Sequence, residues 1–208
     1  MAHHRRSIRL KGYDYRQTGA YFVTICAYGR ACLFGKIIDG VVHLSPLGCL
    51  VRDEWEQTAV LRDNVELDAF VIMPNHFHGI LVITGLDAPA ANARPPVGAK
   101  FTSVRAQCIA PVQTDGGASE HTAKPPPTST RGVTPTKVLA GSLGAIVRSF
   151  KAAVTRQANR LPGVSSTTIW QRNYHEHIIR NEADLDRIRN YIEGNPSRWN
   201  EDSLYSAE

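Results

Sequence analysis

The chain has 208 residues, 42% of them apolar and 21% charged, which is enough apolar surface to bury the core of one soluble globular domain. No apolar run reaches the roughly 20 residues of a membrane helix, and the basic N-terminus lacks a secretory signal, so we expect a cytoplasmic protein. Its four cysteines are then expected to be free thiols, without a disulfide scaffold or a zinc finger. The net charge of +5, with arginine as 18 of the 24 basic residues, favours a polyanionic partner.

The first part of the chain, 1–85, predicts strands around a single helix. Four segments have the aromatic, β-branched or alternating pattern of strands: 20–28, 36–44, 65–73 and 76–84. The second segment contains Asp39-Gly40, which is a turn signal. A helix is expected to begin at Pro46, because Ser45 is a suitable N-cap and apolar residues follow at helical spacing. The fourth strand is apolar on both sides beyond its histidines, so we expect it to be central.

The segment from about 86 to 136 separates this part from the rest of the chain. It holds eight of the 12 prolines and almost no apolar periodicity, so we expect a disordered, flexible insertion. An amphipathic helix with a basic outer face is expected around 139–154, followed by a strand near His175–Ile179. A last helix is expected between its N-cap Asn181 and a stop at Gly194. The two flanking parts therefore predict one α+β domain, a two-layer sandwich with an antiparallel sheet.

The first candidate for chemistry is the run His76-Phe77-His78. On a strand, residues i and i+2 project from the same face, so both imidazoles can point at one ion while Phe77 anchors the strand in the core. Two histidines leave a divalent ion short of ligands, so a third protein ligand is implied. The plain alternative is a pair of histidines that holds no metal.

The second candidate is Tyr191 with Asn195, at the end of the last helix. Residues four apart share a helix face, so the tyrosine hydroxyl and the asparagine oxygen can reach one neighbouring site. An amide oxygen is a suitable ligand for a hard metal ion. The plain alternative is a tyrosine at the edge of a core helix, with an asparagine that caps the helix before Pro196.

A competing site contains a second tyrosine and a second histidine pair, in the run Tyr174-His175-Glu176-His177. On a strand, His175 and His177 share one face while Tyr174 and Glu176 share the other. Tyr174 and His177 are therefore alternative catalytic candidates. A polar edge strand, or an edge that contacts DNA, explains the same run without catalysis.

Three stretches outside the proline-rich segment have a distinctive content and order: 7–25, Met73–His78 and Trp170–Pro196. Together they resemble the REP-associated tyrosine transposases, which are relatives of the small single-strand DNA transposases of the HUH class. The resemblance covers about 1–85 and 137–200. It implies a ferredoxin-like α+β fold with a central antiparallel sheet, with the histidine pair on a central strand and the nucleophilic tyrosine on a C-terminal helix.

The resemblance also implies a reaction and the residues that carry it. Tyr191 would be the nucleophile, and His76, His78 and Asn195 would hold Mg²⁺ or Mn²⁺, although insertion-sequence relatives have a longer glutamine in place of this asparagine. The enzyme would cleave and rejoin single-stranded DNA at repetitive palindromic hairpins through a 5′-phosphotyrosine. The energy of the phosphodiester stays in that link, so the absence of a nucleotide-binding P-loop motif agrees with this chemistry.

Basic side chains that can follow the phosphates of a single strand occur in several places. The candidates are Arg5, Arg6, Arg9, Lys11, Arg148, Lys151 and Arg172. Two other functions remain open: a hairpin DNA-binding module without catalysis, and a hydrolytic metallonuclease that uses both histidine pairs. Replication initiators and relaxases share the HUH chemistry but carry further domains, for which 208 residues leave no room. The sequence leaves both a monomer and a homodimer open, and DNA binding would associate the protein with the nucleoid.

Overall fold

The computed structural model describes residue 10 and residues 12–85, 106–108, 139–161, 164 and 168–205. The strands are β1 (Gly19–Cys26), β2 (Gly35–Ile38), β3 (Val41–Leu44), β4 (Val65–Met73), β5 (His76–Ile83), β6 (Ala106–Cys108) and β7 (His175–Ile179). The helices are α1 (Pro46–Val60), α2 (Leu143–Ala158) and α3 (Glu182–Gly194), with short 3₁₀ helices η1 (Tyr28–Arg30) and η2 (Pro196–Glu201). The expected strands and helices are thus present, with ends that differ by a few residues.

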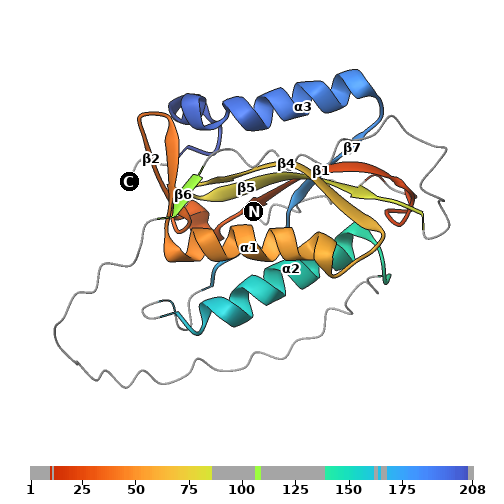
Figure 1. The fold of residues 1–208 in the computed structure, drawn as a ribbon, viewed down its shortest axis with the longest axis horizontal. Helices are drawn as coiled ribbons and strands as arrows, with labels where there is room; N and C mark the ends of the chain where they lie inside the picture. The colour runs from red at the N-terminus through yellow and green to blue at the C-terminus, as the bar shows by residue number, and fades with distance from the viewer. Residues whose placement is uncertain are drawn as a thin grey trace, which may run out of the picture.

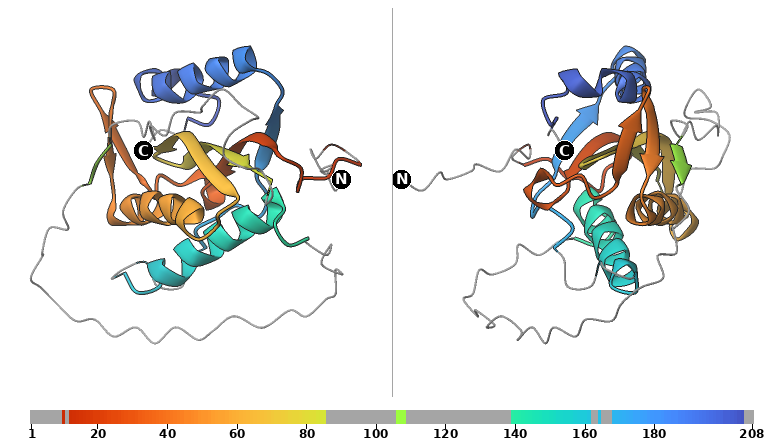
Figure 2. Two further views of the ribbon diagram at one scale, coloured as in Figure 1. Left: turned by 45° about the vertical axis from the view of Figure 1, so that its right-hand side comes forward. Right: turned by 90° about the vertical axis from the view of Figure 1, so that its left-hand side faces the viewer.

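The centre of the fold is an antiparallel sheet with the strand order β4-β5-β1-β7. Helices α1 and α2 cover one face of this sheet, and α3 crosses the other face, as the views in Figures 1 and 2 agree. This arrangement confirms the expected α+β class with a central antiparallel sheet. We expected two layers, one sheet and one layer of helices, whereas helices cover both faces of this sheet. Every residue of the central strand β5 is therefore buried.

The core between the sheet and the helices α1 and α2 is built on aromatic contacts. The ring of Phe77 lies 4.6 Å from the ring of Trp55 on α1 and 5.8 Å from that of Phe150 on α2. All three side chains are buried. Because Phe77 points to this side of β5, the two histidines that flank it point to the side of α3. The packing of Phe77 therefore fixes β5, and with it the positions of the two histidines on the opposite face.

The smaller sheet has the order β2-β3-β6. The turn between β2 and β3 contains Asp39 and Gly40, with φ of 51° and 73°, as a two-residue hairpin with both central residues in the left-handed region requires. The strand β6 pairs in parallel with β3. It lies within the expected insertion, so this short stretch is a strand rather than part of a disordered segment, while the rest of 86–136 lies outside the described residues.

The expectation of four free thiols is wrong for two of the cysteines. Cys49, at the start of α1, forms a disulfide with Cys108 at the end of β6. The two residues are 59 positions apart, and no spacing rule connects them. They meet because β6 joins the edge of β3, whose end leads directly into α1. Cys26 is a free thiol among the described residues, as expected.

Helix α3 is fastened to the sheet by a bidentate ion pair between Arg189 and Asp68 of β4. The guanidinium Nε donates to Asp68 Oδ1 at 2.9 Å, and Nη2 donates to Oδ2 at 2.6 Å. The carboxylate side chain is only 7% exposed. Asp68 lies where the β4–β5 register shifts between Leu67 and Phe70, and it is a buried carboxylate on a mainly apolar strand. The pair sets the position of α3 over the histidines.

We expect Arg189→Met to lower the free energy of unfolding by about 3 kcal/mol, because the change removes the guanidinium whose charge balances the buried Asp68 carboxylate. Chemical denaturation monitored by circular dichroism measures this loss. The same change at the exposed Arg180, just before α3, should alter stability by less than about 0.5 kcal/mol. The double variant Asp68→Leu/Arg189→Met should recover most of the loss, and a double variant as unstable as the single one would contradict the role of this pair.

Among the described residues, no helix combines the length and the apolar character that crossing a membrane requires.

Candidate metal and tyrosine site

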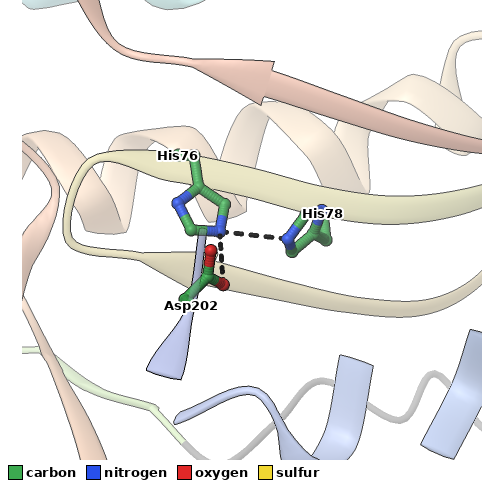
Figure 3. A group of neighbouring side chains, drawn as sticks. All are labelled: His76, His78 and Asp202. Atoms are coloured by element: carbon green, nitrogen blue, oxygen red, sulfur yellow. Dashed lines mark hydrogen bonds and ion pairs between the residues drawn. The ribbon is translucent and has the colours of Figure 1, made fainter. Parts of the chain in front are cut away.

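The side chains of His76 and His78 meet on the α3 side of β5. Their Nε2 atoms lie 3.0 Å apart, and both side chains are almost completely buried (Figure 3). Burial lowers the pKa of His76 to about 4 and holds the pKa of His78 well below its usual range. Both imidazoles are therefore neutral near pH 7, which is the form that binds metal ions. The predicted projection of the pair from one strand face is what the structure shows.

Two neighbouring side chains orient the imidazoles. Asn75 Oδ1 lies 2.8 Å from His76 Nδ1, and as an amide oxygen it accepts the proton that this nitrogen donates. Thr24 Oγ1, on the adjacent strand β1, lies 2.8 Å from His78 Nδ1. When both Nδ1 atoms carry protons, both Nε2 lone pairs face the same point. Such hydrogen bonds on the far nitrogen are typical of metal-binding histidines.

The amide of Asn75 is itself fixed on its other side. Asn75 Nδ2 donates to the carbonyl of Leu204 at 2.8 Å and to that of Arg30 at 3.2 Å. The side chain is 1% exposed, so these contacts replace water. Asn75 therefore links the histidine strand to the segment that follows η2.

That segment brings a carboxylate to the histidines. Asp202 Oδ2 lies 3.8 Å from His76 Nε2, and one ligand atom each from His76, His78 and Asp202 fall within 4.8 Å of one another. Asp202 Oδ1 accepts the backbone N–H of Leu204 at 2.7 Å, which turns Oδ2 toward the histidines. Two neutral imidazoles and a buried carboxylate are a suitable ligand set for a divalent cation.

The predicted third ligand, Asn195, lies beside Asp202. Helix α3 ends at Gly194, as predicted, and Asn195, in the right-handed helical region (φ −62°, ψ −44°), leads directly into the 3₁₀ helix η2. Asn195 Nδ2 donates to Asp202 Oδ2 at 3.2 Å, and its Oδ1 is buried without a hydrogen-bond partner among the residues that the structure describes. A buried amide oxygen without a partner next to a carboxylate fits a site for a cation, since a cation would satisfy both.

Tyr191 reaches the same place from α3. Its hydroxyl lies 3.1 Å from His78 Nε2, and its ring meets Phe22 of β1 edge-on at 6.2 Å. Partial burial and the charge of Asp202 raise the pKa of Tyr191, while Asn195 and the guanidinium of Arg198 act in the opposite direction. The side chain is 41% exposed, so the hydroxyl is next to the histidines and still open to a ligand from solvent.

The competing run on β7 is split between two faces, as predicted. His175 and His177 are exposed, and His177 Nε2 is bonded to Asp184 Oδ2 at 2.8 Å. Together with Tyr191 they line a pocket between the sheet edge and α3. Tyr174 is partly buried and packs against the apolar core. The structure therefore brings the histidine pair of β5 together with Tyr191 and does not bring it together with Tyr174.

Three of the basic residues predicted to contact DNA lie in the described part of the chain: Arg148, Lys151 and Arg172. Arg148 and Lys151 lie on α2, which covers the opposite face of the sheet (Figure 1). Lys151 donates to the carbonyl of Gln171, and burial lowers its pKa to about 8. Arg172 is exposed in the segment before β7. Arg5, Arg6, Arg9 and Lys11 lie outside the described residues.

Sequence reasoning missed three residues of the site: Asn75, Asp202 and Arg198. Asn75 directly precedes the first histidine, where an amide is well placed to hold a metal-binding imidazole, so this signal was available. Asp202 and Arg198 follow Gly194 at no diagnostic spacing. Their approach depends on the path of η2, which the sequence pattern does not specify.

Comparison with known proteins gave one close relative. A protein of Haemophilus influenzae (strain ATCC 51907 / DSM 11121 / KW20 / Rd), described as an uncharacterized protein, is 39% identical over 203 residues, which is 98% of this chain and 94% of the relative. The chain belongs to the same family as this protein. No family model matches the sequence.

A solved structure shows the same fold. The structure of a REP-associated tyrosine transposase bound to a REP hairpin matches 93% of this chain and 74% of its own, with a TM-score of 0.51 and 17% identity. At this identity the likeness concerns the fold alone.

Proposed function

We propose that this chain, a member of one family with the Haemophilus influenzae protein and similar in fold to a REP-associated tyrosine transposase, is itself a tyrosine transposase of the HUH class. It cleaves and rejoins single-stranded DNA at repetitive palindromic hairpins through a 5′-phosphotyrosine intermediate. The observation that carries the proposal is the contact of 3.1 Å between Tyr191 on α3 and His78 on β5. Tyr191, the proposed nucleophile, lies 113 positions along the chain from His78 and yet contacts it.

The residues that would hold the divalent ion, Mg²⁺ or Mn²⁺, are His76 and His78 with an oxygen ligand from Asp202 or Asn195. When bound, the ion would draw charge from the oxygens of the scissile phosphate and make its phosphorus more electrophilic. The side chains of His76, His78, Asn195 and Asp202 are all at least nine-tenths buried, so the surrounding packing holds them in place. Rigid packing of this kind would keep the geometry of these metal-binding side chains constant during the reaction.

Tyr191 is the group that reacts. Its phenolic oxygen forms a bond to the phosphorus while the bond from phosphorus to the 3′-oxygen breaks, and the 3′-oxygen leaves with a proton. The phenol must lose its own proton, which costs more here because burial raises the pKa of Tyr191. The guanidinium of Arg198 works against that shift and favours the phenolate. In the reverse step, a 3′-hydroxyl attacks the phosphotyrosine and releases Tyr191, so no nucleotide cofactor is required.

The substrate is single-stranded or hairpin DNA. Support comes from the net charge of +5 and from the partly exposed Tyr191, which a flexible single strand can reach. The solved structure of similar fold is that of a transposase bound to a REP hairpin. The basic residues Arg5, Arg6, Arg9 and Lys11 remain candidates for contacts with the DNA backbone.

The test is to trap the covalent intermediate and identify the tyrosine that carries it. The protein is incubated with labelled hairpin DNA and Mn²⁺, separated on a denaturing gel, digested, and analysed by mass spectrometry for a nucleotide on a tyrosine peptide. We expect an adduct on Tyr191 that EDTA abolishes. An adduct on Tyr174 would contradict the site, cleavage without an adduct would indicate a hydrolytic metallonuclease, and binding without cleavage would indicate an inactive hairpin-binding module.

A further inference from the structure

Next to Tyr191, a pocket of about 470 Å³ opens between α3 and the edge of the sheet formed by β1 and β7. Its volume is in the usual range for a pocket that takes one small organic group. Tyr191 lines both this pocket and the site of the two buried histidines, so whatever fills the pocket adjoins the reacting hydroxyl. Of the residues that line the pocket, Tyr191 and Arg198 take part in the proposed reaction, and the remaining lining residues have no role in it.

The sheet side of the pocket offers a flat aromatic surface. Phe22 lies with its ring stacked on His78 at 5.3 Å and an interplanar angle of 24°, and it meets Tyr191 edge-on. These contacts hold the ring in place from two sides. Phe22 is partly exposed and lines the pocket, so part of its surface is open to a ligand. An unpaired base can stack on such a surface.

The rim of the pocket offers groups that can form hydrogen bonds with a base. Asn190, next to Tyr191 on α3, is exposed and has both a donor and an acceptor on its amide. His175 on β7 pairs with Thr24 of β1, which places it in one row with Thr24 and His78 across the sheet. His177 is already held by Asp184, so His175 and Asn190 are the better placed pair.

A positive charge lies at the end of the pocket. Arg198 crosses the end of α3 where Gly194 has no side chain, and a Cβ at that glycine would lie 2.5 Å from Arg198 Nη2. Within the described residues, the hydrogen bond recorded for this guanidinium is from Nε to the Gly194 carbonyl at 3.5 Å, and no carboxylate pairs with it. Its outer N–H groups can therefore bind a phosphate.

From these contacts we propose that the pocket binds the base of one nucleotide that flanks the scissile phosphate and selects among bases at that position. Phe22 provides the stacking surface, Asn190 and His175 read the edge of the base, and Arg198 holds the adjoining phosphate. The inference rests on the proposed function, because it places the nucleotide by reference to Tyr191. It adds a base-specific contact to a site whose other contacts are to phosphate, which carry no sequence information.

The test is a binding selection that needs no catalysis. DNA hairpins with fully randomised single-stranded extensions on both sides are bound to the protein in EDTA, and the bound fraction is sequenced. We expect the wild-type protein to enrich one base about tenfold at one position of an extension, which is the size of preference that a single base contact gives. Asn190→Ala and His175→Ala should reduce this enrichment to about twofold or less.

Two further variants separate base reading from general binding. Arg198→Ala should weaken binding of all sequences and leave the base preference in place, because a phosphate contact is independent of sequence. Arg156→Ala removes the same charge from the exposed surface of α2, on the other side of the sheet, and should change neither property. Unchanged melting temperatures show that the variants are folded.

The outcomes distinguish this inference from the proposed function. If wild-type protein shows no base preference, or if Asn190→Ala and His175→Ala both retain it, the pocket does not read a base, even when a covalent adduct forms on Tyr191. If the preference depends on these residues and no adduct forms, the pocket is confirmed and the proposed chemistry is wrong.

Discussion

Tyr191→Phe is expected to abolish the covalent protein–DNA adduct, with a loss of at least about 10⁴-fold in its rate of formation. The substitution removes one oxygen, which is the atom that would bond to phosphorus. The aromatic ring can keep its edge-on contact with Phe22 and its neighbour His78, so the fold of α3 should not change. Single-turnover incubation with labelled hairpin DNA and Mn²⁺, stopped with detergent, measures this rate.

The control for this loss is Tyr174→Phe, because Tyr174 is partly buried against the apolar core. The adduct should form at the wild-type rate in this variant. DNA affinity measured in EDTA should be the same in both variants within about threefold. If Tyr191→Phe keeps the adduct while Tyr174→Phe loses it, the reaction class stands and the nucleophile has been assigned to the wrong tyrosine.

The histidine pair and the tyrosine could be predicted because each follows from a local rule. Spacing of two on a strand places His76 and His78 on one face, and the run of buried positions on β5 shows that this strand is central. Helical spacing and the N-cap Asn181 place Tyr191 on a helix that must lie against the sheet. Their meeting required a resemblance to a known family, since no local rule states which face of the sheet α3 covers.

The remaining parts of the site could not be predicted, because they depend on tertiary contacts. Gly194 ends α3, as the sequence suggests, but no sequence signal shows that the chain then forms η2 and returns Asp202 to the histidines. The Asp68–Arg189 pair joins positions 121 apart, and it is the sheet register that brings them together. The Cys49–Cys108 disulfide likewise depends on β6 pairing with β3, which a segment rich in proline does not suggest.

The second large effect concerns the ligands of the metal ion. His78→Ala is expected to remove measurable Mn²⁺ binding, because one of two convergent imidazoles is lost and the remaining set is too small. The adduct should fall with it by about 10³-fold or more. Isothermal titration with Mn²⁺ measures the affinity, and the rise of the melting temperature on addition of Mn²⁺ provides a readout that is independent of activity.

The two oxygen residues should differ in their effects because their contacts differ. Asp202 is a buried carboxylate, and its Oδ2 faces His76 at 3.8 Å, so Asp202→Asn removes the negative charge that balances the cation. We expect this variant to weaken Mn²⁺ binding about 100-fold. Asn195 donates to that same oxygen at 3.2 Å, so Asn195→Ala would act mainly by loosening Asp202, with an expected loss of about tenfold.

The reverse order of the two losses would mean that the asparagine is the ligand. Its buried Oδ1 has no hydrogen-bond partner in the described part of the chain, so it could turn toward the ion while the carboxylate serves to hold the amide. Asn195→Asp separates the two cases further. If Asp202 is the ligand, a second carboxylate beside it brings two negative charges together and should destabilise the protein without metal, an effect that Mn²⁺ would relieve. If Asn195 is the ligand, the new carboxylate would bind the ion directly, and Asp202→Asn should then weaken Mn²⁺ binding little in this variant.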